Sequence, residues 1–205
     1  MTIHKMEQRT PEWYQIRLGK FTASSDFQVC ASGKPDTHKK LVYKKAAELI
    51  TGCQADEHYT NASMERGIEL EAEGLQAFEM ATGLPIEKVG FITNSDSSGC
   101  SPDGLIYARD GVEMKCPDKH THLGYLINGR GNLYQWQIQG SMWVTGFDTW
   151  YFVSYNADFP PETRLFIELV SRDEDKILKI SNGVNVLTDD LKRVMVEYGG
   201  VKYQQ

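Results

Sequence analysis

Asp103 lies in the sequence Ser101-Pro102-Asp103-Gly104, and ten residues later Glu113 begins the sequence Glu113-Met114-Lys115. The proline before Asp103 and the glycine after it indicate a turn that leads into a strand. On a strand, alternate side chains share one face, so Glu113 and Lys115 point the same way, about 6.6–6.8 Å apart along the axis. Met114 then points the other way, into apolar packing.

A hairpin is expected to bring these charged groups together. The turn Arg109-Asp110-Gly111 pairs a strand over 99–108 with one over 111–116 and returns Glu113 toward Asp103. Two carboxylates suit a hard divalent cation such as Mg²⁺, which stabilises charge on a phosphate and lowers the pKa of a bound water. Lys115 can orient or deprotonate that water, or stabilise developing negative charge. The pattern favours metal-assisted phosphodiester hydrolysis over a solvated surface hairpin.

The composition is that of a soluble globular protein. The chain has 205 residues, of which 40% are hydrophobic and 24% charged, so we expect a single domain over 1–205. It contains no apolar run near 18 residues and no apolar core of a secretory signal, which predicts a cytoplasmic protein without a membrane span. The net charge of −6 argues against non-specific nucleic-acid binding. If the substrate is DNA, its contact would depend on local basic patches such as Lys39-Lys40 with Lys44-Lys45.

Hydrophobic periodicity and turn residues predict an alternation of helices and strands. Helices are expected at 11–18, from Thr22 or Ser24 to Cys30, at 37–51, 62–82, 132–145 and 173–198. Strands are expected at 88–93, 99–108, 111–116, 150–155 and 164–170, with a loop over 117–131. This order predicts an α+β fold with a central mixed sheet of five strands and helices on both sides.

Two polar side chains are expected to face inward from helices. Glu71 projects from the edge of the apolar stripe of helix 62–82, where a carboxylate is costly unless paired or bound to a metal. It is either salt-bridged to a buried Arg or Lys, or a third acidic group of the metal site. Gln137 lies at the edge of the apolar face of helix 132–145. It is either a satisfied core amide or a ligand of phosphate or metal-bound water.

Three further segments accompany the S-P-D-G-L and E-M-K-C-P motifs. They are residues 12–24 (EWYQIRLGKFTAS), 67–71 (GIELE) and 134–143 (YQWQIQGSMW). Together the five motifs resemble the lambda exonuclease and YqaJ-type viral recombinase branch of the PD-(D/E)xK nucleases. The resemblance runs in unbroken order over about residues 12–172. It implies a restriction-endonuclease-like core.

The resemblance also implies an activity. Members are Mg²⁺-dependent 5′→3′ double-strand DNA exonucleases of phage-type recombination, and Mn²⁺ is expected to substitute for Mg²⁺. They act processively as toroidal homotrimers that encircle DNA and start at double-stranded ends. The 3′ single-stranded overhang is passed to a single-strand annealing protein. A phage- or prophage-encoded protein of the bacterial cytoplasm is therefore expected.

The same resemblance implies roles for individual residues. The metal is expected on the Asp103 and Glu113 carboxylates and the Met114 carbonyl. Lys115 is the catalytic lysine, and Glu71 acts through the metal site. The 5′-phosphate is expected to contact four residues: Arg17, Ser24, Ser101 and Gln137. This set is chemically reasonable, because arginine grips phosphate bidentately and the hydroxyls and amide donate further hydrogen bonds.

Two other hypotheses remain. The first is an endonuclease of the same superfamily, of the restriction or resolvase type, which differs from an exonuclease in not requiring a DNA end. The second is a catalytically inactive protein that binds DNA ends as a scaffold for an annealing protein. The intact set of Asp103, Glu113 and Lys115 argues against this second hypothesis.

Overall fold

The computed structural model describes residues 1–55 and 62–198. The single domain predicted over 1–205 includes 56–61 and 199–205, which lie outside the described residues. The strands are β1 (Thr2–His4), β2 (Phe21–Thr22), β3 (Phe91–Ser95), β4 (Ser98–Cys100), β5 (Gly104–Ile106), β6 (Asp110–Lys115), β7 (Thr149–Tyr155) and β8 (Leu165–Ser171). The helices are α1 (Pro11–Arg17), α2 (Phe27–Ser32), α3 (Pro35–Thr51), α4 (Ala62–Thr82), α5 (Lys119–Asn128), α6 (Gln135–Thr145) and α7 (Glu174–Tyr198).

The predicted α+β class is confirmed, but the sheet differs from the expected single five-stranded one. There are two four-stranded sheets, with strand orders β1-β3-β4-β2 and β5-β6-β7-β8. Both are mixed, because β2 runs parallel to β4 and β6 runs parallel to β7, while the other neighbours are antiparallel. A bridge between Glu87 and Leu105 connects the chain before β3 to the second sheet.

Pro102 accounts for the second sheet. The expected strand over 99–108 is split, since β4 ends at Cys100 and β5 begins at Gly104. Proline has no N–H to donate to a ladder, so the strand cannot continue through it. The chain instead crosses from one sheet to the other, and pairing resumes at Asp103, whose N–H donates to the Val112 carbonyl at 3.1 Å.

The turn between β5 and β6 also lies earlier than predicted. It comprises residues 107–109, and Tyr107 and Ala108 take positive φ angles of 52° and 49°. Gly111 lies inside β6 instead of in the turn. A Cβ there would lie 2.3 Å from the ring of Trp150, so the glycine makes room for that buried indole.

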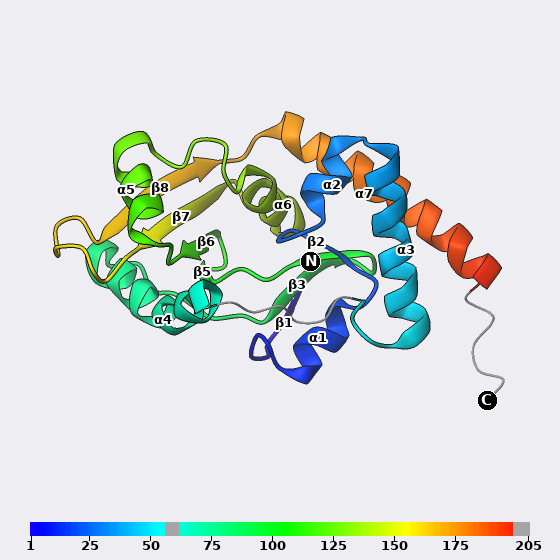
Figure 1. The fold of residues 1–205 in the computed structure, drawn as a ribbon, viewed down its shortest axis with the longest axis horizontal. Helices are drawn as coiled ribbons and strands as arrows, with labels where there is room; N and C mark the ends of the chain where they lie inside the picture. The colour runs from blue at the N-terminus through cyan, green and yellow to red at the C-terminus, as the bar shows by residue number, and fades with distance from the viewer. Residues whose placement is uncertain (56–61, 199–205) are drawn as a thin grey trace.

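The helices cover both faces of the β5–β8 sheet, as Figure 1 shows. Helix α4 packs on one face, whereas α5 and α6 pack on the other. The α4 face holds a small core that includes Phe78, Val112 and Met114. A larger core joins the α6 face to α2, α3 and α7.

No helix of the described ranges is long and apolar enough to cross a membrane.

The segment 117–131, expected to be a loop, contains helix α5. Asp118 caps it, since its carboxylate accepts a hydrogen bond from the Thr121 N–H at 3.2 Å. Two buried side chains, His122 and Tyr125, attach the helix to the protein. The His122 ring bonds the Ser154 hydroxyl at 2.7 Å and the Thr163 carbonyl at 2.9 Å. This helix therefore depends on long-range contacts and not on the local periodicity used for prediction. The short strands β1 and β2 were missed for the same reason.

The Gly111–Trp150 contact gives a stability prediction. Gly111→Ala should lower the free energy of unfolding by about 1–3 kcal/mol, because the added methyl overpacks a fully buried ring. Gly124→Ala is the control: Gly124 lies in α5 with open space around its Cα, so alanine should stabilise the helix by about 0.5–1 kcal/mol. Urea unfolding measures both. Equal effects of the two substitutions would contradict this account of Gly111.

Candidate active site

Asp103 and Glu113 are brought together by the β5–β6 hairpin. Gly104 pairs with Val112, so one step further along the ladder Asp103 lies opposite Glu113. The Asp103 Oδ2 atom accepts a hydrogen bond from the Met114 N–H at 2.6 Å. The hairpin thus sets the distance between the two carboxylates, and the convergence follows from backbone pairing.

Glu113 is 1% exposed, although it is a carboxylate. Its Oε1 atom accepts hydrogen bonds from the Lys115 ammonium and, at 2.7 Å, from the Gln137 amide nitrogen. The Lys115 Nζ also lies 4.9 Å from the centre of the Tyr134 ring, a cation–π contact. Lys115 is therefore held between a carboxylate and an aromatic face, with 26% of its side chain exposed.

The electrostatics of the site are those of like charges held close together. Burial and the nearby Glu113 carboxylate raise the pKa of Asp103 well above its usual value. Burial alone would lower the pKa of Lys115, but the Glu113 and Asp103 carboxylates outweigh it and raise that pKa. The site therefore favours Lys115 as a cation, and it disfavours the ionised form of Asp103 in the absence of a further cation.

Glu71 reaches the same place from α4. It lines an open cleft of about 540 Å³ together with Asp103, Met114 and Lys115. Its Oε2 atom also accepts a hydrogen bond from the Arg9 guanidinium at 3.0 Å. The sequence predicted that Glu71 either forms a salt bridge with a buried Arg or Lys or belongs to the metal site. In the structure Glu71 pairs with Arg9, which is partly exposed, and lies in the same cleft as Asp103.

The donor set fits a hard divalent cation. Asp103, Glu113 and the Met114 carbonyl supply oxygen ligands only, which Mg²⁺ and Mn²⁺ prefer. Within residues 1–55 and 62–198, no group of three or more His, Cys, Asp or Glu side chains is arranged to hold a metal ion. A divalent cation bound here would be held by the two carboxylates and the Met114 carbonyl. The raised pKa of Asp103 is the second sign of fit, since a cation beside it would favour its ionised form.

A polar pocket lies beside the carboxylates. Arg17, at the end of α1, donates to the Ser101 hydroxyl at 3.0 Å and lies 3.5 Å from the Ser24 hydroxyl. Its guanidinium stacks 4.1 Å from the centre of the Trp13 ring. The Trp13 Nε1 donates to the Ser101 Oγ at 3.0 Å and to the Gly90 carbonyl at 2.9 Å. Three of the four residues expected at the 5′-phosphate are thus in one cluster.

The fourth, Gln137, lies between that cluster and the carboxylates. It bonds Glu113, and it lines a cleft of about 400 Å³ with Ser24 and Tyr134. The satisfied core amide of α6 is its neighbour Gln139, which is 4% exposed and bonds the Ser171 carbonyl and the Asp173 N–H, both at 2.8 Å.

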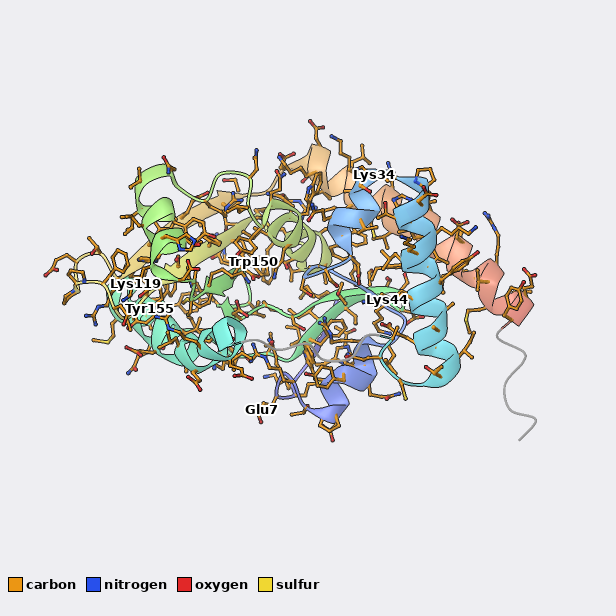
Figure 2. All side chains as sticks on the ribbon, in the orientation of Figure 1. Glu7, Lys34, Lys44, Lys119, Trp150 and Tyr155 are labelled. Carbon is orange, nitrogen blue, oxygen red and sulfur yellow. The ribbon has the colours of Figure 1, made fainter. Side chains whose placement is uncertain are left out.

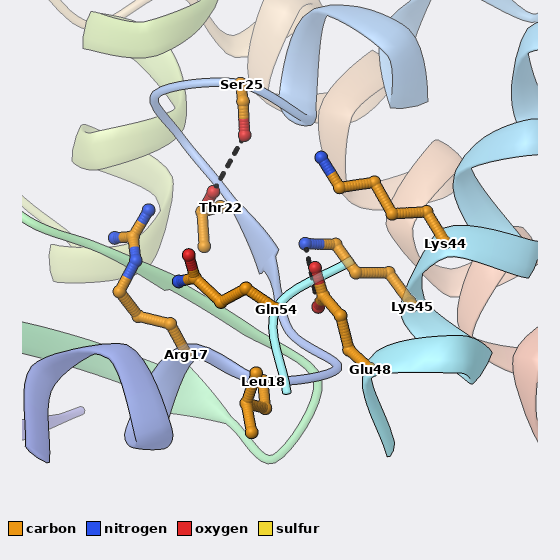
Figure 3. Close-up of a pocket in the computed structure, with 8 residues that line it drawn as sticks. All are labelled: Arg17, Leu18, Thr22, Ser25, Lys44, Lys45, Glu48 and Gln54. Atoms are coloured by element: carbon orange, nitrogen blue, oxygen red, sulfur yellow. Dashed lines mark hydrogen bonds and ion pairs between the residues drawn. The ribbon is translucent and has the colours of Figure 1, made fainter. Parts of the chain in front are cut away.

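Arg17 also lines a small polar cavity of about 150 Å³, and Figure 3 shows the residues around it. Lys44 and Lys45 reach toward it from α3, but their settings differ. Lys45 is 5% exposed and pairs with Asp26 at 3.2 Å and Glu48 at 3.4 Å. Lys45 is therefore part of a buried ion cluster, and the basic patch suggested for DNA contact cannot include it.

Three residues near the site were not singled out from the sequence. Trp13 has a signal, because it precedes Arg17 by four residues on a helix and shares its face. Tyr134 and Arg9 have none: both adopt left-handed backbone conformations, with φ of 57° and 67°, that local sequence does not predict for these residue types.

Comparisons with known proteins show which family the chain belongs to. Residues 12–148 match the model of the YqaJ-like viral recombinase domain. The chain belongs to this family. An alkaline exonuclease from Laribacter hongkongensis is 31% identical to this member, with a TM-score of 0.81 over 92% of this chain and 95% of that one. The same enzyme in complex with dAMP gives the same values.

A second solved structure supports the fold. A phage-related exonuclease from Haemophilus somnus 129PT has a TM-score of 0.66 at 19% identity, over 95% of this chain and 97% of that one. No curated protein matches the chain.

The raised pKa of Asp103 gives a second stability prediction. At pH 8 without metal, Asp103→Asn should raise the free energy of unfolding by about 1 kcal/mol, because it removes a disfavoured charge and keeps an acceptor for the Met114 N–H. The folded-state pKa lies above the unfolded one, so the charge penalty is full at high pH. It is lost as the pH falls toward the unfolded value.

The gain should therefore shrink between pH 8 and pH 5. Urea unfolding in EDTA at the two pH values measures it. An Asp103→Asn protein that is less stable than the parent at pH 8 would contradict the electrostatic account.

Proposed function

We propose that this protein is a Mg²⁺-dependent 5′→3′ double-strand DNA exonuclease that digests the 5′-phosphorylated strand. The observation that carries the proposal is the adjacency of two groups. Asp103 and Glu113 form an oxygen-donor pair beside Lys115. Ser101, which accepts a hydrogen bond from Arg17, is separated from Asp103 along the chain by Pro102 alone. Family membership and the similarity to an alkaline exonuclease support the same activity.

Each residue of the site has a role in this reaction. Asp103, Glu113 and the Met114 carbonyl would hold Mg²⁺ or Mn²⁺, which supplies charge stabilisation and a more acidic bound water. Lys115 is oriented by Glu113 and Tyr134 and carries a raised pKa. Its ammonium is therefore placed to donate hydrogen bonds to developing negative charge.

The Arg17 cluster accounts for the requirement of a DNA end. Trp13 and Ser101 hold the guanidinium in place, and Ser24 and Gln137 line the adjoining cleft. The α-carbons of Ser101 and Asp103 can be at most about 7 Å apart. A terminal phosphate bound at Arg17 therefore places a nearby phosphodiester at the carboxylates.

The proposal extends to the assembly. A toroidal homotrimer that encircles DNA reconciles the net charge of −6 with a nucleic-acid substrate, because a basic channel and an acidic exterior can coexist. The ring keeps the enzyme on its substrate, and the 3′ overhang is available to a single-strand annealing protein. Light scattering of the purified protein tests the trimer directly.

Digestion of a linear duplex labelled at either end, with and without a 5′-phosphate, tests the activity. Nucleotides should be released from the 5′-phosphorylated end in Mg²⁺. Lys115→Ala should reduce the rate by at least about 10²-fold, the scale of lost transition-state stabilisation at one group. Equal release by both proteins would remove Lys115 from the mechanism. Cutting of closed circular duplex as fast as linear duplex would favour the endonuclease alternative, and no release would favour the inactive scaffold.

The end-binding assignment has its own test. Arg17→Ala should slow digestion of 5′-phosphorylated duplex by about 10-fold or more, the worth of one charge-assisted contact. Digestion of 5′-hydroxyl duplex should change little, because that end lacks the charge that Arg17 binds. Rates on the two substrates, measured in parallel, decide the matter: an equal slowing on both means that Arg17 is not an end receptor.

A further inference from the structure

A second cavity adjoins the catalytic cleft on the far side of Glu71. It measures about 340 Å³ and is lined by the segment 6–9, Lys88 and Val89. Glu71, Asp103 and Arg9 line both this cavity and the catalytic cleft. The two spaces therefore adjoin at these three residues.

Arg9 lies at the boundary between the two spaces. Its backbone φ of 67° is in the left-handed region, which is unfavourable for any residue with a side chain. Such a conformation persists only where the surroundings enforce it. The neighbours of Arg9 do so: the Gln8 amide donates to the carbonyls of Val89 at 3.1 Å and Pro102 at 2.8 Å. Thr10 caps α1 and bonds the Glu7 carbonyl at 2.9 Å.

The side chain held in this way is suited to an anion. Arg9 is 42% exposed and donates to Glu71 through one terminal nitrogen, which leaves the rest of its planar fork facing the cleft. Across the cavity, Lys88 is exposed and forms no ion pair with any residue of the described ranges. Glu7, labelled beside α1 in Figure 2, is the acidic side chain of the cavity besides the shared Glu71 and Asp103.

We propose that this cavity is a second phosphate subsite, in which Arg9 and Lys88 bind a backbone phosphodiester of the substrate strand. The inference rests on the proposed function, because it takes the strand in the catalytic cleft to be DNA. Arg9 bonds Glu71 with one nitrogen and a phosphate oxygen with others. Lys88 adds a point charge on the opposite side. The subsite holds the strand on the side of the carboxylates away from Arg17, so that the reacting phosphodiester is fixed from both directions.

Salt-dependent DNA binding tests the subsite without relying on turnover. Fluorescence anisotropy of a 5′-phosphorylated duplex in EDTA, over a series of KCl concentrations, gives the slope of log K against log salt. Each lost phosphate contact should reduce that slope by about 0.9. Arg9→Gly and Lys88→Ala should each show this reduction and weaken binding roughly tenfold at fixed salt, and the double variant should show twice the reduction in slope.

The choice of Arg9→Gly separates binding from folding. Glycine adopts a φ of 67° without strain, so the variant should have an unchanged or higher melting temperature. Lys5→Ala is the matched control: it removes one exposed cation of the same segment, paired with Glu87 at 3.0 Å, that does not line the cavity. Its slope should equal that of the parent protein.

The outcomes distinguish this inference from the proposed function. Slopes for Arg9→Gly and Lys88→Ala that match Lys5→Ala overturn the subsite, even if the parent protein digests DNA. Slower digestion by Arg9→Gly with an unchanged slope also overturns it, and assigns Arg9 to positioning Glu71 alone. A parent protein that binds DNA with the expected slopes but releases no nucleotide in Mg²⁺ supports the subsite while the exonuclease proposal fails.

Discussion

The two hydrogen bonds of Asp103 with β6 determine the rest of the site. Its N–H donates to the Val112 carbonyl, and its carboxylate accepts from the Met114 N–H. Because these bonds fix the hairpin register, Asp103 must lie opposite Glu113, and Met114 must present its side chain to the α4 core. A slip of one residue would exchange the two faces of β6. It would place Glu113 among the apolar side chains of the α4 core and the Met114 side chain where Glu113 now meets Lys115 and Gln137. The chemistry of the site therefore depends on the register of the hairpin.

Holding these charges together is unfavourable, and the surrounding structure offsets only part of the cost. Lys115 and Gln137 satisfy Glu113, and Arg9 satisfies Glu71. Within the described residues, the Asp103 carboxylate accepts a hydrogen bond from the Met114 N–H alone, and burial and the Glu113 charge raise its pKa. The buried ion cluster behind Arg17 differs, because there Lys45 lies between two carboxylates. In the first arrangement Asp103 keeps a raised pKa that a bound cation would offset, whereas in the second Thr22 and the Gly19 N–H donate further hydrogen bonds to Asp26 and Glu48, as in a structural cluster.

The sequence predicted the parts of this fold that depend on local pattern. The glycine after α4 indicated where that helix ends, at Thr82, and the alternation in β6 indicated the faces of Glu113 and Lys115. The failures have two causes. The split of the expected strand follows from Pro102 itself, a local signal that the prediction of a strand over 99–108 overlooked. The helix within 117–131 depends on where distant segments pack. The Arg17 cluster was expected from the resemblance. The contact of its guanidinium with the Trp13 ring was not predicted, although the four-residue spacing on α1 is a signal for it.

Backbone strain also separates residues that form the scaffold from residues that line the site. Within the described residues, four non-glycine residues have positive φ: Arg9, Tyr107, Ala108 and Tyr134. Tyr107 and Ala108 lie in the three-residue turn 107–109 that joins β5 to β6, so the connection itself requires their conformation. Arg9 and Tyr134 also lie in turns, one before α1 and one at the start of α6, but neither turn joins two strands. Both line the catalytic cleft, Arg9 against Glu71 and Tyr134 against Lys115. Glycine would relieve the strain at either position, but it would remove the side chain that contacts a charged group of the site. The strain is therefore best understood as the cost of aiming these two side chains at Glu71 and Lys115.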